Sequence, residues 1–492
     1  MSFKHFNSPF SIFNPSHYSL PINPKRLSFI LGPLLFGAAL LFMPAIFSFK
    51  AKAALGLLLW MCCWWVFIPL PVSCTAFLPI IVNAFFDLVP MDSITSKFFS
   101  EITILLFGAD LLSLSWEKCG LDKRLAMRAL CIIGPKIHQQ IIVWFLLATL
   151  LSAVLPNAVV CAIMLPIAIS MLKFVGEKDI QRSRIAAIIM VAITWGSGIG
   201  GLGTPLGGAM NLLAVDQFEQ LSGREYAYAS WTAHLLPFLI MLALANLLLL
   251  FTIKPSKKVL PGSRYFFEQQ YAKLPPISRD EKISLVLFIV ATVMAFARPL
   301  YAQLLPGLKP AYVFLLAGLL LTLIPSCKED RATLLSWAEA ERGVIWGLLF
   351  IFAGGAALGS IITDTGAAAA IAQMVANLNL HGGILTILVF TVFTVSLAET
   401  ASNTAAAAIA LPIVISVTQA AGLDPIPYVY ITAAAFNTSY MLPTSIRAIP
   451  IGHGLSPTFL FQHGLKQTLS GIILITLLGW MFINFWPYFS SI

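Results

Sequence analysis

Apolar runs about twenty residues long occupy most of this chain, and they limit its possible folds more than any other feature. Eleven such runs lie near residues 27–47, 51–70, 73–90, 99–119, 183–214, 230–253, 282–299, 310–326, 343–364, 427–452 and 467–488. At a rise of 1.5 Å per residue, about 20 apolar residues cross the hydrocarbon core of a bilayer. Only 10% of the 492 residues are charged, whereas a soluble domain carries roughly 25%. The sequence therefore predicts an all-α polytopic membrane protein with about 11 transmembrane helices.

Two further apolar runs, 140–172 and 383–418, are longer and are interrupted at their centres. The interruptions lie in "LPNAVVCAIMLPI" (155–167) and "AETASNTAAAAIALPI" (398–413). Irregular backbone at membrane depth survives only where protein or a water-filled cavity satisfies its polar groups. Each run therefore predicts a re-entrant hairpin that enters and leaves the membrane on the same side.

The basic residues collect on one side of this topology. With the N-terminus inside and both hairpins returning, 24 of the 30 Lys and Arg residues face the inside. The outside keeps Lys50, Lys52, Lys97, Arg224, Arg298 and Lys309. The positive-inside rule predicts this bias, so the net charge of +9 indicates orientation rather than a nucleic-acid partner. We expect an integral plasma (inner) membrane protein whose residues 1–26 form a cytoplasmic tail, with a targeting segment there as the alternative.

A repeat relates the two halves of the chain. A constant offset of 246 residues separates Gly108 and Gly354, Gly120 and Gly366, Asn157 and Asn403, Leu165 and Leu411, and Pro166 and Pro412. An odd number of crossings in each half makes the two copies inverted, which is the architecture of secondary transporters. We predict one membrane domain, 27–492, with repeat 1 at about 51–253, a cytoplasmic linker at 254–281 and repeat 2 at about 282–488.

Motifs of other functional classes are missing from the sequence. The seven cysteines have no spacing typical of a metal site, and no H-E-x-x-H motif or P-loop is present. We therefore predict a protein that is not an enzyme, has no cofactor and is not driven by ATP.

Each hairpin is followed by a second break. Residues 196–211, "GSGIGGLGTPLGGAMN", contain seven glycines, and residues 435–450 read "AFNTSYMLPTSIRAIP". Glycine costs about 1 kcal/mol relative to alanine inside a helix, so the first segment does not favour a continuous helix. Both segments predict unwound centres of broken helices that face the hairpin tips.

The polar residues at the second tip suit ion binding. The half-helix after a hairpin tip presents free N–H groups and the positive end of its dipole, which favour an anion. Ser402, Asn403 and Thr404 add hydrogen-bond donors, and carbonyl groups of the unwound segment can ligate a cation. The alternative reading is that these residues only cap a membrane-spanning helix.

These motifs bear a resemblance to a known family. "ETASNTAAAAIALPI", "GGLGTP" (200–205), "WEKCGLDKRLA" (116–126) and "WGLLFIFAGGAALG" (346–359) resemble the divalent anion:sodium symporter family, which carries dicarboxylates, citrate or sulfate. The resemblance runs from about residue 50 to the C-terminus. It implies eleven spans with two hairpins, a homodimer, and an elevator-type displacement of the hairpin-bearing domain, with Na⁺ as the coupling ion.

The resemblance also implies site residues. Substrate contacts are expected at Asn157, Ser402, Asn403, Thr404 and Arg447. Sodium is expected between each tip and its facing broken helix, at Ser152, Asn157, Gly201, Ala401 and Asn403. The first tip departs from the family pattern, because Pro156 and Ala158 flank Asn157 where the second tip has Ser and Thr. Ala398 stands where the family usually has Thr beside the second sodium.

Three charged residues within the apolar runs are candidates for coupling or support. Arg447 replaces an uncharged proline of the family and can supply fixed positive charge to an anion, or mark the inner end of a helix. Asp110 replaces an apolar residue, and a carboxylate within a span is by default functional; a buried structural role is the alternative. Glu399 matches a family acid and is expected to support the tip.

The sequence thus predicts a secondary active transporter of small divalent anions, of C4 dicarboxylate type, with citrate or sulfate as further candidates, coupled to sodium. The alternatives are a sodium-independent anion exchanger, a proton-coupled carrier, or an arsenite or cation antiporter of the wider ion-transporter superfamily. An integral-membrane enzyme would need clustered catalytic side chains that the sequence does not offer.

Overall fold

The structure is a computed structural model that describes residues 24–44, 47–328, 331–367 and 381–491. Residues 1–23, most of the predicted cytoplasmic tail, lie outside the described residues. Within the described ranges the chain folds into α- and 3₁₀-helices with two isolated β-bridges and no strand. This agrees with the all-α architecture that the apolar runs predict.

The first half of the chain contains most of the long helices. In order they are α1 (Pro24–Phe42), α2 (Phe49–Phe67), α3 (Val72–Thr75), α4 (Leu78–Phe86), α5 (Met91–Thr95), η1 (Ser96–Phe99), α6 (Glu101–Cys119), α7 (Leu121–Leu130), α8 (Ile137–Ser152), α9 (Asn157–Phe174), α10 (Arg184–Gly200), η2 (Gly201–Gly203), α11 (Ala209–Ser222) and α12 (Tyr228–Phe251). The connection to the second half carries α13 (Ser263–Ala272).

The second half follows a similar order. Its helices are α14 (Arg279–Phe296), α15 (Arg298–Tyr301), α16 (Pro310–Leu323), α17 (Trp337–Gly343), α18 (Trp346–Asp364), α20 (Ile384–Thr400), α21 (Asn403–Ala420), α22 (Pro425–Phe436), η4 (Ser445–Arg447), α23 (Ala448–Gly452), α24 (Pro457–Phe485) and η5 (Pro487–Ser490). In the described residues, eight helical stretches are long and apolar enough to cross a membrane, and shorter apolar helices lie between them. The protein is therefore a multi-pass membrane protein; the count of eleven spans stays a prediction.

One predicted span is not a continuous helix. The run 73–90 folds into the four-residue α3 and the nine-residue α4. Helix α4 ends because Asp87 takes the left-handed conformation, with φ of 47°. The Asn83 side chain then accepts hydrogen bonds from the N–H groups of Leu88 and Val89, both at 3.0 Å. These bonds satisfy backbone donors outside the helix and stabilise its end.

The residues that define the 246-residue repeat occupy equivalent places. Asn157 and Asn403 are the first residues of α9 and α21. Pro166 and Pro412 lie inside those same two helices. Gly120, after α6, and Gly366, after α18, both adopt positive φ, at 86° and 74°. The repeat is therefore structural as well as sequential.

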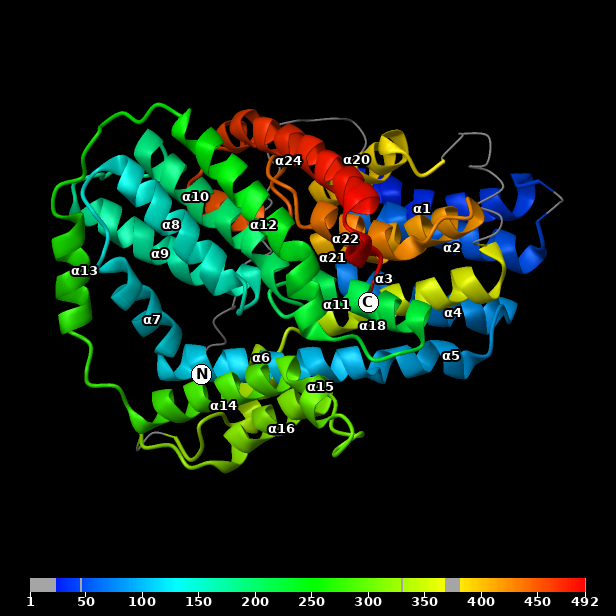
Figure 1. Ribbon diagram of the computed structural model, residues 1–492, viewed down its shortest axis with the longest axis horizontal. Helices are drawn as coiled ribbons and strands as arrows, with labels where there is room; N and C mark the ends of the chain where they lie inside the picture. Colours follow the sequence, from blue (N-terminus) through cyan, green and yellow to red (C-terminus); the bar gives the residue numbers. More distant parts are fainter. Residues whose placement is uncertain (1–23, 45–46, 329–330, 368–380, 492) are drawn as a thin grey trace.

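The two hairpins lie in the body of the molecule, among the helices that follow them. Helix α10 packs against α8 and α9, while α20, α21 and α22 pack on one another. Helices α14 and α16 pack against α6 and form a separate layer along the lower edge of Figure 1. Helix α24 crosses the upper side and contacts α12, α20 and α22. The hairpins and broken helices thus form one group, and α6, α14 and α16 form another.

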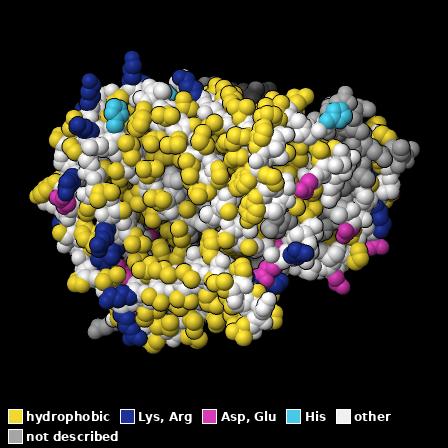
Figure 2. Space-filling view, viewed as in Figure 1, with side chains coloured by type: hydrophobic (Ala, Val, Ile, Leu, Met, Phe, Trp, Pro, Cys, Tyr) yellow, Lys and Arg dark blue, Asp and Glu magenta, His cyan; other side chains and the backbone are white. Residues whose placement is uncertain are grey.

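The surface agrees with a membrane setting. Figure 2 shows hydrophobic side chains across the broad face of the molecule, with most visible Lys and Arg at the end that carries α13. Such a band of apolar surface, flanked by a basic end, is typical of a protein with an inner, positively charged side. Arg447 is not part of that basic end, because its side chain is only 1% exposed.

Candidate functional site

The two hairpin tips are short non-helical connections between half-helices. Helix α8 ends at Ser152 and α9 begins at Asn157, and α20 ends at Thr400 before α21 begins at Asn403. Ser402 caps α21, with its Oγ accepting from the N–H of Ala405 at 3.1 Å. At the first tip Pro156 stands in the capping position and makes no side-chain bond. The tips therefore repeat in backbone but differ in their hydroxyl groups.

The glycine-rich segment allows α10 to lie directly on α8. A Cβ added at Gly196 would lie 2.5 Å from the carbonyl oxygen of Phe145, and one at Gly200 would lie 2.7 Å from the Cα of Thr149. Only glycine leaves room for so close an approach of two backbones. The first hairpin is thereby held against the helix whose break faces its tip.

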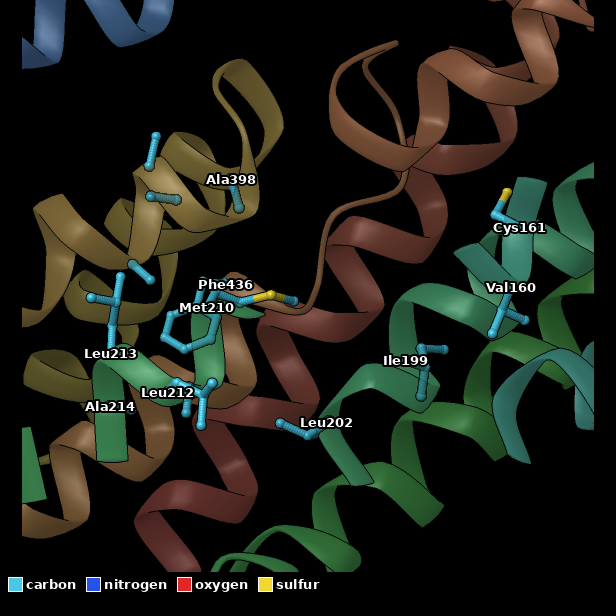
Figure 3. Packing of buried hydrophobic residues seen from close by; sticks show 14 of the residues in the cluster. Val160, Cys161, Ile199, Leu202, Met210, Leu212, Leu213, Ala214, Ala398 and Phe436 are labelled. Atoms are coloured by element: carbon cyan, nitrogen blue, oxygen red, sulfur yellow. The ribbon is translucent and has the colours of Figure 1, made fainter. Parts of the chain in front are cut away.

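The first broken helix unwinds after Gly200. Residues 201–203 form a 3₁₀-turn and α11 starts at Ala209. The Nδ2 of Asn211 donates to the carbonyl oxygens of Gly201 at 2.7 Å and Thr204 at 3.0 Å, and so helps to satisfy the backbone of this break in the interior. Figure 3 shows buried apolar residues around this break, with Ile199 before it, Leu202 within it and Met210 after it.

The second broken helix unwinds after Phe436. The chain is non-helical from Asn437 to Thr444 before η4 and α23. Ser445 has φ of 52°, a conformation that residues other than glycine adopt at a cost of about 1–3 kcal/mol. Both breaks predicted from the sequence are thus present.

The second break lies close to residues of both tips and of the first break. The Nδ2 of Asn437 donates to Oδ1 of Asn211 at 2.9 Å, which links the two broken helices. A Cβ on Gly201 would lie 3.4 Å from both Nδ2 of Asn157 and Oδ1 of Asn437. Two residues further on, the hydroxyl of Ser439 donates to Oδ1 of Asn403 at 3.2 Å. Asn157 and Asn403, which are far apart in the sequence, therefore flank the same unwound segment.

Several donors at the tips remain unused. Within the described residues, the side chains of Asn157 and Thr404 make no hydrogen bond, and Asn403 uses only its Oδ1. The Ser402 hydroxyl accepts from Ala405 and its own proton has no acceptor there. Asn157 and Ser402 are partly exposed, whereas Asn403 is 3% exposed. These four side chains can donate to an anion placed between the tips.

Glu399 organises the second break from the end of α20. Its carboxylate accepts from the N–H groups of Tyr440 at 2.6 Å, Met441 at 3.1 Å and Leu442 at 3.0 Å. The hydroxyl of Thr468 on α24 donates to the same carboxylate at 2.7 Å. Backbone donors aimed at one carboxylate hold the unwound segment in place. Glu399 thus binds the backbone of the second break, and its supporting role in transport stays a prediction.

Arg447 is buried and fully bonded. Its Nε donates to the carbonyl oxygen of Leu442 at 2.6 Å. One terminal nitrogen donates to the carbonyl oxygen and the hydroxyl of Ser439. The other terminal nitrogen donates to the carbonyl oxygen of Ala398 and the hydroxyl of Thr444. Glu399 Oε2 lies 3.7 Å away. A guanidinium has five N–H protons, so none remains for a substrate carboxylate.

The first break packs tightly on the first tip at Gly207. Around the Cβ position of Gly207 lie the carbonyl oxygens of Ser152 at 2.5 Å, Gly201 at 2.8 Å and Ala153 at 3.2 Å. The Ser152 hydroxyl donates to the carbonyl oxygen of Ser197 at 2.7 Å and is itself fully buried. Two of these oxygens already accept hydrogen bonds, that of Gly201 from Asn211 at 2.7 Å and that of Ala153 from Thr204 at 2.6 Å. The structure thus brings Ser152, Asn157 and Gly201 together.

At the second tip the corresponding residues lie beside Arg447. Ala401 is 1% exposed and its N–H donates to the carbonyl oxygen of Leu397 at 2.8 Å. Asn403 contacts Ser439, which also accepts from Arg447. The described residues contain no group of three or more His, Cys, Asp or Glu that could hold a metal.

Asp110 lies away from the tips. It is 8% exposed in α6, and its Oδ2 accepts from the N–H of Ile345 at 3.1 Å, just before α18 begins. The bond satisfies a backbone donor at a helix start and matches the structural alternative considered for this residue. The structure does not bring Asp110 together with the other candidates.

Some residues of this site were not singled out from the sequence. Asn211, Asn437, Ser439, Thr444 and Thr468 all bond within it. The signal for the first four was their position in the two predicted breaks, where buried polar side chains satisfy free backbone groups. Thr468 lies in an ordinary apolar helix and carried no such signal.

Comparisons with known proteins agree with this geometry. A family model described as citrate transporter matches residues 62–435. A protein of Staphylococcus saprophyticus named sodium-dependent dicarboxylate transporter SdcS is 28% identical over 476 residues, covering 93% of this chain and 91% of that protein. The protein of the same name in Staphylococcus aureus strain NCTC 8325 is 28% identical over 461 residues, covering 90% and 88%.

One solved structure is only distantly similar. The crystal structure of the Alcanivorax borkumensis YdaH transporter, described as having an unusual topology, has a TM-score of 0.47 at 12% identity and covers 95% of this chain and 100% of that chain. The family match, by contrast, extends over more than half of the sequence and confirms the resemblance to divalent-anion transporters. This multi-pass membrane protein therefore belongs to the citrate transporter family.

Proposed function

We propose that this protein is a secondary active transporter of small divalent anions, chiefly C4 dicarboxylates, coupled to sodium. The observation that carries the proposal is the set of unused donors on Asn157, Ser402, Asn403 and Thr404 around one unwound segment. Family membership and relatives named sodium-dependent dicarboxylate transporters support the same function.

Neutral donors at two helix starts suit a dianion with two separated carboxylates. Helices α9 and α21 begin at Asn157 and Asn403, and the first N–H groups of a helix carry partial positive charge. One carboxylate at each tip would complete hydrogen bonds that the protein leaves open. Succinate and malate each carry two carboxylates, and citrate is the larger anion to compare with them.

Sodium would bind at the first tip. The Asn157 side chain, which makes no hydrogen bond of its own within the described residues and lies close to Gly201, supports this assignment together with the nearby buried Ser152. A cation there draws the tip toward the first break and places positive charge beside an anion held by Asn157. Binding of the two ions would then favour each other, and this is the thermodynamic basis of coupled transport.

We propose that transport moves the group formed by the hairpins and broken helices relative to α6, α14 and α16, as an elevator. The dense contacts of α8, α9 and α10 within the first group support its movement as one body. This proposal also includes a homodimer, a location in the plasma membrane, a cytoplasmic N-terminus and the domain limits 27–492. Light scattering of the purified protein checks the dimer.

The test is uptake of labelled succinate into proteoliposomes under an inward sodium gradient, a potassium control and an inward proton gradient. We expect sodium-dependent uptake that unlabelled malate inhibits. Asn403→Ala should lower uptake at least about tenfold, since hydrogen bonds to charged groups contribute about 1.5–3 kcal/mol each. Asn484→Ala, on α24 and exposed, is the matched control and should leave uptake unchanged.

Two results would contradict the proposal. Uptake indifferent to sodium but driven by an anion inside the vesicle would indicate an exchanger. Uptake driven by protons alone would indicate a proton-coupled carrier. If no dicarboxylate enters under any gradient, citrate and sulfate are the next anions to measure.

A further inference from the structure

The Arg447 guanidinium lies in a ring of acceptors. Three are backbone carbonyl oxygens, of Ala398, Ser439 and Leu442, and two are the hydroxyls of Ser439 and Thr444. They come from the end of α20 and from the second break, the two segments that face each other at this tip. Together they surround one buried positive group with neutral oxygen atoms, the ligand type that hard cations also prefer.

The positive charge is balanced locally. Glu399 Oε2 lies 3.7 Å from the nearer terminal nitrogen, and both side chains are 1% exposed. Removing one member of a buried ion pair leaves an uncompensated charge, which is strongly unfavourable. Arg447 therefore supplies the buried positive charge beside Glu399, in addition to the backbone and Thr468 donors that bind this carboxylate.

The equivalent position at the first tip holds no such side chain. Residues 149–158 and 196–211 contain no Lys or Arg. The two halves repeat the same tip and the same break. They differ in that the second half supplies its own cation from the chain.

We propose that Arg447 is a tethered cation that replaces a coupling ion at the second tip, so that this tip is ordered for anion binding without sodium. The inference deepens the proposed function and rests on it for the anion. Sodium coupling, where present, is then confined to the first tip. Arg447 acts as a positioning residue, because it has no free donor for the substrate.

A tethered cation lowers the number of sodium ions that are coupled to each anion. A mobile ion enters and leaves with each cycle, whereas a tethered guanidinium stays in place. The protein should therefore couple fewer sodium ions per anion than a transporter with two mobile sites, and sodium should act with a Hill slope no higher than about one.

The first experiment measures thermal unfolding of the purified full-length protein in sodium, potassium and choline chloride at equal ionic strength. Wild type should show at most the response of one site. Arg447→Ala should unfold at a lower temperature and gain an additional rise in sodium over potassium, because a small cation can then enter the emptied ring. Guanidinium chloride at low millimolar concentration should raise the Tm of Arg447→Ala but not that of wild type.

Arg298→Ala is the matched control. Arg298 is also buried, at 5% exposure, and donates to Glu225 at 2.7 Å and to the carbonyl oxygens of Leu305 and Pro306. Its removal should lower the Tm without creating a sodium response. A sodium response of equal size in both variants, or in neither, would overturn the proposal.

The sodium dependence of uptake by wild type tests the proposal even if Arg447→Ala does not fold. Sodium dependence of succinate uptake by wild type should follow a slope of about one or show no dependence. A slope of about two would overturn the proposal. If wild type transports no dicarboxylate at all, the proposed function fails, while the ion response in the unfolding experiment still tests Arg447 independently.

Discussion

Glu399 is a buried carboxylate whose hydrogen bonds hold the unwound segment of the candidate site. It accepts from the N–H groups of Tyr440, Met441 and Leu442 and from the hydroxyl of Thr468. These donors would otherwise lie unpaired in an unwound segment at membrane depth, where each costs several kcal/mol. The acid therefore stabilises a backbone conformation, and through it the positions of Ser439 and Asn403.

Replacing Glu399 by Gln should damage this arrangement. The amide keeps the shape of the side chain but removes the charge and turns an NH₂ group toward backbone N–H donors, while Arg447 loses its counter-charge. We expect a loss of about 3–5 kcal/mol in stability and at least about a tenfold fall in succinate uptake, measured by thermal unfolding and in proteoliposomes. Glu117→Gln, an exposed acid on α6, is the control and should change neither.

Asp110 allows the structural and coupling interpretations to be separated. If it only caps the start of α18 through Ile345, Asp110→Asn keeps an acceptor and should change stability and uptake little, whereas Asp110→Ala should cost about 1–2 kcal/mol. Unfolding and uptake are measured for both variants. Loss of proton-driven uptake in Asp110→Asn, with stability unchanged, would instead assign Asp110 to coupling.

At the scale of elements, the site depends on helices that stop. Helices α8 and α20 end at the tips, and α10 and α22 end at the breaks. Each ending leaves free backbone groups, which Asn211, Asn437 and Glu399 partly satisfy. Close packing of α10 on α8 keeps the first tip opposite its break, so the glycines in α10 matter as much as the polar residues.

Gly200→Ala should therefore be disruptive, because the new Cβ would lie 2.7 Å from the Cα of Thr149. We expect a loss of about 1–3 kcal/mol or more from overpacking, with lower expression and Tm. Gly198→Ala is matched to it, two residues away in the same helix. Its Cβ would lie 3.4 Å from the flexible end of Ile446, and alanine favours the helix. Equal destabilisation by both substitutions would contradict the packing argument.

At the scale of the whole molecule, the loops on the basic side tie the first hairpin to the linker between the halves. The N–H of Ile137 donates to the carbonyl oxygen of Lys258 at 3.0 Å, and that of Leu260 to the carbonyl oxygen of Pro135 at 2.7 Å. The Glu177 carboxylate, just after the hairpin, accepts from Lys257 at 2.6 Å. The predicted linker 254–281 is thus attached to the hairpin rather than extended.

This attachment predicts a limited pH dependence. The hydrogen bond from Lys257 lowers the pKa of Glu177 below its ordinary value of 4.5. Its contribution to stability is therefore complete above that value and is lost as the pH falls through the lowered pKa. Because the Lys257 side chain is 58% exposed, we expect at most about 1 kcal/mol. Glu177→Gln should reduce the difference in Tm between pH 6 and pH 4 relative to wild type; an unchanged difference would contradict this.

Most helices, the two interrupted apolar runs, the two breaks and the repeat could be predicted from the sequence, whereas the division of 73–90 into α3 and α4 could not. These features depend on local chemistry: apolar length, glycine and proline content, and polar residues within apolar runs. Asn157 and Asn403 could be selected in the same way, because the offset of 246 residues pairs them.

The hydrogen-bond partners of the buried polar and charged side chains are known only from the tertiary structure. The sequence left open that Arg447 binds an anion. In the structure its N–H groups instead donate to the carbonyl oxygen of Ala398, 49 residues away, and to acceptors in the adjoining break. Asp110 receives its partner from Ile345, 235 residues away, and Asn437 meets Asn211 across 226 residues. A local pattern shows that a buried polar group needs a partner, whereas the identity of that partner depends on which segments the fold brings together.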